Sequence, residues 1–215
     1  MPDHQLRAGF QRDLQEIDGK VVQLFALVGE GLAAATEAFL AGDRESAKQL
    51  LEQDALIDSL YHDVERLVQH QFALQTPMAR DLRFLLSVLR IVPELERSGD
   101  LAEHIAQKAA RGLTDELTPR IRGLIEQMGR VGVEMWRRAT DAYVDRDADA
   151  YDQLHEADDE LDDLHLSLTA ELVSGTLTVP VALEMSLVGR YYERLGDHAV
   201  NVANRVRYLA RGESD

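Results

Sequence analysis

Pairs of acidic residues four positions apart are the feature of this sequence that could do chemistry. Asp54 and Asp58 form one pair, and Glu96 and Asp100 form another. On a helix, residues four apart project from the same face with their Cβ atoms about 6 Å apart. Such pairs are common on solvated surfaces, so one pair alone indicates no function.

The spacing of the two pairs about Pro77 is more informative. Asp54 lies 23 residues before Pro77 and Asp100 lies 23 residues after it, while Asp58 and Glu96 are each 19 residues away. Two antiparallel helices that turn near Pro77 would therefore bring all four carboxylates to one level. A second set of four is arranged in the same way about the loop at 174–179: Asp158, Asp162, Glu193 and Asp197.

Four carboxylates at one level repel each other by on the order of 1 kcal/mol or more per close pair, unless they are protonated or bridged by cations. The spacing therefore predicts a metal site in each half, with all eight acids as ligands. Oxygen ligands suit Mg²⁺, Mn²⁺, Zn²⁺ or iron, and four carboxylates per site permit more than one ion. His104 and His165 lie one or two turns away and are not assigned as ligands.

Two neighbouring features leave an alternative open. Arg97 and Arg194 directly follow the glutamates, and exposed ion pairs with these arginines would neutralise the acids without a metal. Gly99 and Gly196 each cost a helix about 1 kcal/mol relative to alanine, which indicates that something approaches the backbone closely there. A packed helix and a metal cluster would both account for these glycines.

The elements that must position these residues are helices. Apolar residues recur at steps of three and four from Leu14 to Val28 and from Val188 to Leu209, and no long stretch alternates with a period of two. Pro93 lies inside a helical stretch and predicts a bend just ahead of Glu96. Glycine and proline punctuation predicts six helices, at 5–41, 44–73, 78–111, 119–145, 148–173 and 179–211.

Composition narrows the class of protein. The 215 residues include 45% apolar residues and no cysteine, which excludes disulfides and thiolate chemistry. A net charge of −16 argues against nucleic-acid binding. The N-terminus lacks an apolar signal region and no stretch is expected to span a membrane, so we expect a cytoplasmic protein that does not insert into a bilayer.

The chain also repeats itself. The segment from Ala35 to Asp43 matches the segment from Ala139 to Asp147 at an offset of 104, and Glu96–Asp100 matches Glu193–Asp197 at an offset of 97. Because the motifs occur in the same order in both halves, we predict an all-α fold of two tandem three-helix bundles, with domains at 1–113 and 114–215.

The motifs resemble those of the PhoU family of phosphate-transport regulators. The segments DLRFLLSVLRIVPELERSGDLAEHIA and YYERLGDHAVNVANRV resemble the signatures of that family's third and sixth helices, and the aspartate pairs resemble its acidic motifs. The resemblance implies two pseudosymmetric three-helix bundles with multinuclear iron or zinc on these motifs. Pro93 departs from the usual family pattern.

The resemblance also implies a role and partners. It implies negative control of phosphate uptake and of starvation signalling, through contact with the ATPase subunit of a phosphate ABC transporter and with a membrane sensor histidine kinase. A homodimer stays open. The chain lacks a P-loop and a G-x-S-x-G motif, so we predict that it is not an enzyme. Metal storage or sensing and a di-metal carboxylate enzyme are the alternatives, although no Glu-x-x-His motif occurs.

Overall fold

The computed structural model describes residues 2–51 and 54–212, except for the side chains of residues 2–6, 8 and 54. All regular structure in these residues is helical, as predicted. Seven α-helices and one 3₁₀ helix follow in chain order: α1 (Pro2–Ala41), α2 (Arg44–Leu50), α3 (Asp54–Leu74), α4 (Ala79–Ala110), η1 (Leu113–Glu116), α5 (Pro119–Asp145), α6 (Ala150–Val173) and α7 (Val179–Arg211).

The helix ends follow the predicted punctuation. Gly42 ends α1 with a positive φ of 69°, and the backbone N–H of Asp43 reaches back to the carbonyl of Ala38. Thr118 caps α5 by accepting a hydrogen bond from the N–H of Ile121. Five of the six predicted helices are present with small shifts at their ends.

One prediction about helix continuity differs from the structure. Instead of a single helix over 44–73, α2 ends at Leu50 and α3 begins at Asp54. Asp43 caps α2 with its side chain and Ala47 buries this short helix against the core. As predicted, α4 includes Pro93 and continues to Ala110, and the bend expected ahead of Glu96 stays a prediction.

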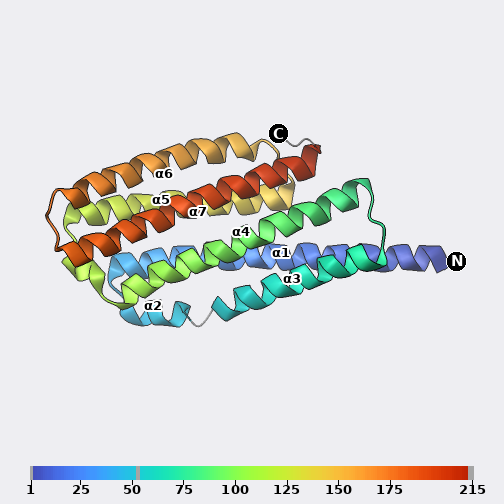
Figure 1. Ribbon diagram of the computed structural model, residues 1–215, viewed down its shortest axis with the longest axis horizontal. Helices are drawn as coiled ribbons and strands as arrows, with labels where there is room; N and C mark the ends of the chain where they lie inside the picture. The colour runs from blue at the N-terminus through green and yellow to red at the C-terminus, as the bar shows by residue number, and fades with distance from the viewer. Residues whose placement is uncertain (1, 52–53, 213–215) are drawn as a thin grey trace.

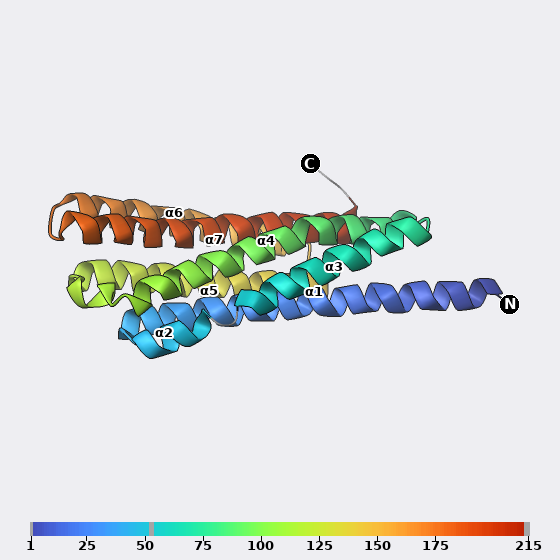
Figure 2. The same ribbon diagram turned by 60° about the horizontal axis from the view of Figure 1, so that its bottom comes forward.

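The two halves pack on each other, with α1–α4 in the first half and α5–α7 in the second (Figure 1). In both views α4 and α7 lie side by side, α3 flanks α4, and α6 flanks α7 (Figures 1 and 2). Behind them α1 contacts α4 and α5, and α5 contacts α7. The four central helices α1, α4, α5 and α7 therefore join the halves, while α3 and α6 are outer helices.

One hydrophobic core runs through both halves. Phe25 of α1 contacts the rings of Trp136 and Tyr143 of α5, with centroids 6.4 and 5.0 Å apart. The Trp136 indole N–H donates to the carbonyl of Leu195 in α7 at 3.1 Å. Burial of these aromatic rings is a large stabilising contribution, so the two halves should unfold together.

The composition of α1 bears on the expectation that no stretch spans a membrane. The stretch Gly9–Ala41 is long and apolar enough to cross a membrane, with a mean hydropathy of 1.5 in its most apolar window. The apolar side of this helix is used inside the protein, since Ile17, Val21 and Leu24 are fully buried. Composition alone does not distinguish α1 from a membrane-spanning helix, and the expectation that no stretch spans a membrane stays a prediction.

Candidate acidic cation sites

The first acidic cluster lies between α3 and α4. Asp58 of α3 is exposed, and Asp100 of α4 is partly buried. Burial raises the pKa of Asp100, and the neighbouring Asp58 carboxylate raises it further. Burial and the neighbouring Glu65 raise the pKa of Tyr61 on α3, and the charge of Glu96 adds to this shift, so Glu96 also lies toward that helix. The side chain of Asp54 lies outside the described residues.

The second cluster lies between α6 and α7 and is more tightly coupled. Burial raises the pKa of Asp158 to about 6, and the charges of Asp197, Asp162 and Glu193 add to the shift. Burial also raises the pKa of Glu193, with Asp197 and Asp162 acting in the same direction. The four acids predicted to share one level in this half are therefore close enough to interact.

Two carboxylate oxygens of the second cluster lack hydrogen-bond partners. Asp158 Oδ1 and Glu193 Oε2 are both buried from solvent, and neither accepts a hydrogen bond. A buried acceptor without a donor costs about 1–3 kcal/mol, and more when it is charged. A proton or a cation at these oxygens would remove that cost.

Where the structure describes an ion pair of Arg97 or of Glu193, its partner differs from the one that the alternative interpretation named. Arg97 pairs with Glu94 on its own helix at 2.8 Å, one turn before Glu96. The ion-pair partner of Glu193 is Arg190, one turn earlier on α7, and not Arg194. Arg190 was not singled out from the sequence, although its spacing of three from Glu193 is a signal for an ion pair.

The two glycines are explained by helix packing. A Cβ atom at Gly99 would lie 2.8 Å from Ile57 Cδ1 of α3. A Cβ atom at Gly196 would lie 2.4 Å from Asp158 Oδ1 and 2.8 Å from Leu161 Cδ2 of α6. Gly196 therefore makes room for a carboxylate of the acidic cluster, whereas Gly99 makes room for an apolar side chain.

Three histidines lie near the acids. His104 moderates the raised pKa of Asp100, and its ring stacks on Tyr191 of α7 with centroids 5.2 Å apart. His165 moderates the raised pKa of Glu193. His155 does the same for Asp158 and was missed in the sequence, although it precedes that residue by one helical turn.

The acidic residues are suitable cation ligands by type and lie near one another. Their side chains, where the structure describes them, are not oriented toward a common point. Carboxylate oxygens are suitable ligands for Mg²⁺, Mn²⁺, Zn²⁺ or iron, and the second cluster offers two buried oxygens without donors. Within the described part of the chain, however, no three His, Asp or Glu side chains converge as a metal ion requires. Side chains on α6 and α7 would have to turn toward a shared ion.

Comparison with known proteins places both halves in one family. The PhoU domain matches residues 21–109 and again 125–206. The chain is 33% identical over 210 residues to "Phosphate-specific transport system accessory protein PhoU homolog 2" of Mycobacterium tuberculosis, covering 96% of this chain and 99% of that protein. It is 36% identical over 208 residues to the PhoU homolog of Aquifex aeolicus, covering 94% and 93%.

Solved structures agree with these matches. The crystal structure of PhoU from Pseudomonas aeruginosa superimposes with a TM-score of 0.88 at 29% identity, covering 95% of this chain and all of that one. The regulatory protein PhoU from Streptococcus pneumoniae has the same fold, with a TM-score of 0.84 at 24% identity over 96% of this chain and 99% of that one.

Proposed function

The chain belongs to the PhoU family, and we propose from this membership that it negatively regulates phosphate uptake and phosphate-starvation signalling. The observation that carries the proposal is that the PhoU domain occurs in both halves, with relatives matched along nearly their whole length. Two of the matched relatives are named accessory proteins of a phosphate-specific transport system. A protein of this class acts on a transporter and need not transform a substrate.

We assign its action to protein contacts on the cytoplasmic side of the membrane. The partners would be the ATPase subunit of a phosphate ABC transporter and the cytoplasmic part of a sensor histidine kinase. An exposed apolar stripe on α7 supports contact with other proteins, because Val179, Leu183 and Leu187 recur every fourth residue and are 72%, 64% and 45% exposed. Apolar side chains at this spacing suit a helical or flat protein surface.

Cations at the two acidic clusters would serve the regulator by fixing its outer helices. A cation between Asp158 and Glu193 would hold α6 to α7, and one between Asp58 and Asp100 would hold α3 to α4. Iron or zinc is the family-level expectation, and manganese or magnesium fits the oxygen donors equally. In this proposal the metal shapes a contact surface and the protein shows no turnover.

Complementation of a strain that lacks every copy of such a regulator tests the proposal. With ample phosphate, that strain should express its phosphate-transporter genes as though starved, and this chain should restore repression. The variant Glu193→Gln/Asp197→Asn should restore it less well. The matched control is Asp141→Asn/Asp145→Asn, an exposed acidic pair four apart on α5, which should repress as wild type.

Two outcomes would redirect the assignment. A folded and expressed wild-type chain that leaves the transporter genes active would reject regulation, and growth defects confined to low metal would then favour metal storage. Phosphatase, ATPase or oxidase turnover that disappears in Asp158→Ala/Asp162→Ala would favour the di-metal carboxylate enzyme.

A further inference from the structure

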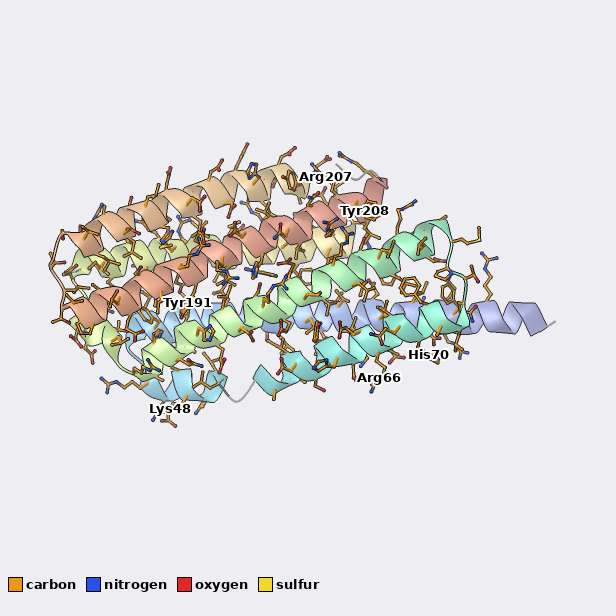
Figure 3. All side chains as sticks on the ribbon, in the orientation of Figure 1. Lys48, Arg66, His70, Tyr191, Arg207 and Tyr208 are labelled. Atoms are coloured by element: carbon orange, nitrogen blue, oxygen red, sulfur yellow. The ribbon has the colours of Figure 1, made fainter. Side chains whose placement is uncertain are left out.

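A row of basic residues follows the seam between α4 and α7. On α4 these residues recur at every seventh position, so they share one stripe of the helix: Arg83, Arg90, Arg97, His104 and Arg111. The antiparallel helix α7 contacts this stripe along its length. Arg111 contacts Glu184 at 3.6 Å, His104 stacks on Tyr191, and a Cβ at Gly212 would lie 3.4 Å from the Arg83 guanidinium. Figure 3 labels Tyr191 and Tyr208 at two levels of α7.

Positive charge is neutralised along one part of this seam and not along the other. Arg97 and Arg111 have carboxylate partners in Glu94 and Glu184. In the described part of the chain, neither Arg83 nor Arg90 forms an ion pair, although carboxylates outnumber basic side chains in the protein, 39 to 23. Burial lowers the pKa of Arg205 on α7, and the facing charge of Arg90 lowers it further.

The end of the seam at Arg83, where the arginines have no ion-pair partner among the described residues, borders a cleft. This cleft has a volume of about 650 Å³ and lies where the start of α4 meets the ends of α5 and α7 and residues 11–18 of α1. Small-molecule sites commonly have roughly 300–1,000 Å³. Three arginines line the cleft together with an apolar wall: Arg80, Arg83 and Arg146, with Leu14, Phe84 and Leu209.

Two of the three arginines in the cleft, Arg80 and Arg83, are available to contact a ligand. Asp18 is already used, because it accepts hydrogen bonds from Arg146 at 2.6 Å and from the Tyr143 hydroxyl at 2.7 Å. Asp81 also lines the cleft and opposes an anion there. Arg80 and Arg83 form no ion pair with any described residue.

Arg83 carries the most specific signal. Its Nε–H is buried and has no hydrogen-bond acceptor among the described residues. A buried donor without an acceptor costs about 1–3 kcal/mol and calls for a bound group or water. The planar guanidinium binds phosphate oxygens in a bidentate manner, and a second arginine strengthens that preference.

We propose that the cleft formed by Arg80, Arg83 and Arg146 binds a phosphate-bearing small molecule. Arg83 and Arg80 contact its phosphoryl oxygens, and Arg146, held by Asp18 and stacked on Tyr143, contributes positive charge at the cleft wall. Phe84 and the neighbouring leucines provide an apolar surface for an organic part of the ligand. This site is separate from the acidic clusters and does not depend on the proposed regulatory function.

Calorimetric titration of the whole chain tests the proposal. The protein is first freed of metal with EDTA, so that cations at the acidic clusters do not recruit the anion. The probes are inorganic phosphate, pyrophosphate and ATP without Mg²⁺, at a fixed low salt concentration. We expect saturable binding of at least one probe, weakened about tenfold or more by Arg83→Gln and by a smaller factor by Arg80→Gln.

Matched variants separate the site from general charge effects. Arg137→Gln removes an exposed arginine on α5 that pairs with Glu134 and Asp141, and it should change affinity by less than about twofold. Asp81→Asn should increase affinity, because it removes the opposing carboxylate. Equal affinities for pyrophosphate and ATP would assign recognition to the phosphoryl groups, and tighter binding of ATP than of pyrophosphate would indicate that the apolar wall also contributes.

The proposal is overturned in either of two cases. One is that none of the three probes binds wild-type protein up to millimolar concentration. The other is that binding survives Arg80→Gln/Arg83→Gln in protein whose circular dichroism and unfolding midpoint match those of wild type. Failure of the complementation assay leaves these titrations unaffected, so the two proposals can fail independently.

Discussion

The two acidic clusters share a sequence motif and differ in how far their carboxylates are buried. In the second half Asp158 is sufficiently buried among carboxylates that its pKa rises to about 6, and two carboxylate oxygens are buried without donors. In the first half Asp58 is exposed, and the raised pKa that burial produces is at Asp100. The same acidic motif thus gives a more strained site in one half than in the other.

The cause of the difference is what packs on the repeated glycine. Gly196 receives the Asp158 carboxylate, which draws that acid between the helices. Gly99 receives Ile57 instead, an apolar side chain that needs no counter-ion. A repeated E-R-x-G-D motif therefore specifies close helix approach in both halves, and the facing helix decides which group fills the space.

Cation binding should show the largest difference between the halves. Because the second cluster has buried oxygens without donors, it should bind Mn²⁺ or Zn²⁺ more tightly than the first. The variant Asp158→Asn/Asp162→Asn should weaken the tighter class of sites by about 100-fold or more, since even indirect partners of ligands contribute 10–100-fold. Calorimetric titration measures both classes.

Controls for that titration lie in the other half and on α5. Asp58→Asn/Asp100→Asn should weaken only the looser class, and Asp141→Asn/Asp145→Asn should weaken neither. Equal losses from the variants of the two halves would show that the clusters do not differ.

Substitutions at the glycines should separate packing from cation binding. Gly99→Ala and Gly196→Ala both overpack a helix contact, which costs about 1–3 kcal/mol and is offset by about 1 kcal/mol of helix propensity. Chemical unfolding should show a net loss of up to about 2 kcal/mol in each. Only Gly196→Ala should also change cation affinity, because its Cβ displaces Asp158.

Gly123 provides the matched control on α5. A Cβ there meets nothing within 4 Å, so Gly123→Ala should raise the free energy of unfolding by up to about 1 kcal/mol. A Gly196→Ala protein as stable as wild type with unaltered cation affinity would contradict the packing at that glycine.

The pH dependence of stability should be a smaller effect. The folded pKa of Asp158 is raised, so the folded state binds this proton more tightly than the unfolded state. Its contribution is present below about pH 4 and is lost as pH rises through about 6. Because Asp158 is partly exposed, we expect its contribution to the free energy of unfolding, measured in EDTA, to be about 1 kcal/mol.

The comparison that isolates this residue is wild type against Asp158→Asn from pH 4 to 7. Burial lowers the pKa of His198 to about 4, and that group changes stability in the opposite direction in both proteins. The difference between the two proteins should therefore follow Asp158 and the acids coupled to it. A constant difference across this range would show that its carboxyl group is not perturbed.

The smallest expected effect concerns Arg190. This exposed arginine pairs with Glu193 and competes with a cation for that carboxylate. Arg190→Gln should tighten cation binding by about two- to fivefold at low salt, and the gain should shrink as salt screens the charge. Arg137→Gln is the control, since its partners lie on α5. Weaker binding in Arg190→Gln would show that the arginine supports the site.

Much of the fold was predictable because its signals are local. Apolar periodicity and the glycine and proline boundaries predicted the long helices, and the equal spacing about the loop at 174–179 predicted the coupling of Asp158 with Asp197 and Glu193. The break between α2 and α3 was not predicted, because helix-forming residues continue through it. Residues 52–53 lie outside the described structure.

The features that the sequence did not reveal depend on contacts between distant residues. Three such features follow from how the helices pack in three dimensions. Asp158 lies against Gly196, α1 contributes to the core, and Arg90 of α4 lies near Arg205 of α7. The basic residues at every seventh position of α4 can be read in the sequence. Which of them have carboxylate partners depends on the antiparallel packing of α7 against α4, which no local pattern specifies.

If the repeated acidic clusters are cation sites and the second is the stronger, anomalous diffraction should show it in crystals soaked in Mn²⁺ and, separately, in Zn²⁺. We expect a peak between α6 and α7 within ligand distance of Asp158 or Glu193 at low metal concentration, with a peak beside Asp100 only at higher concentration. Peaks confined to other carboxylates, or a first-half site that fills before the second, would contradict this expectation.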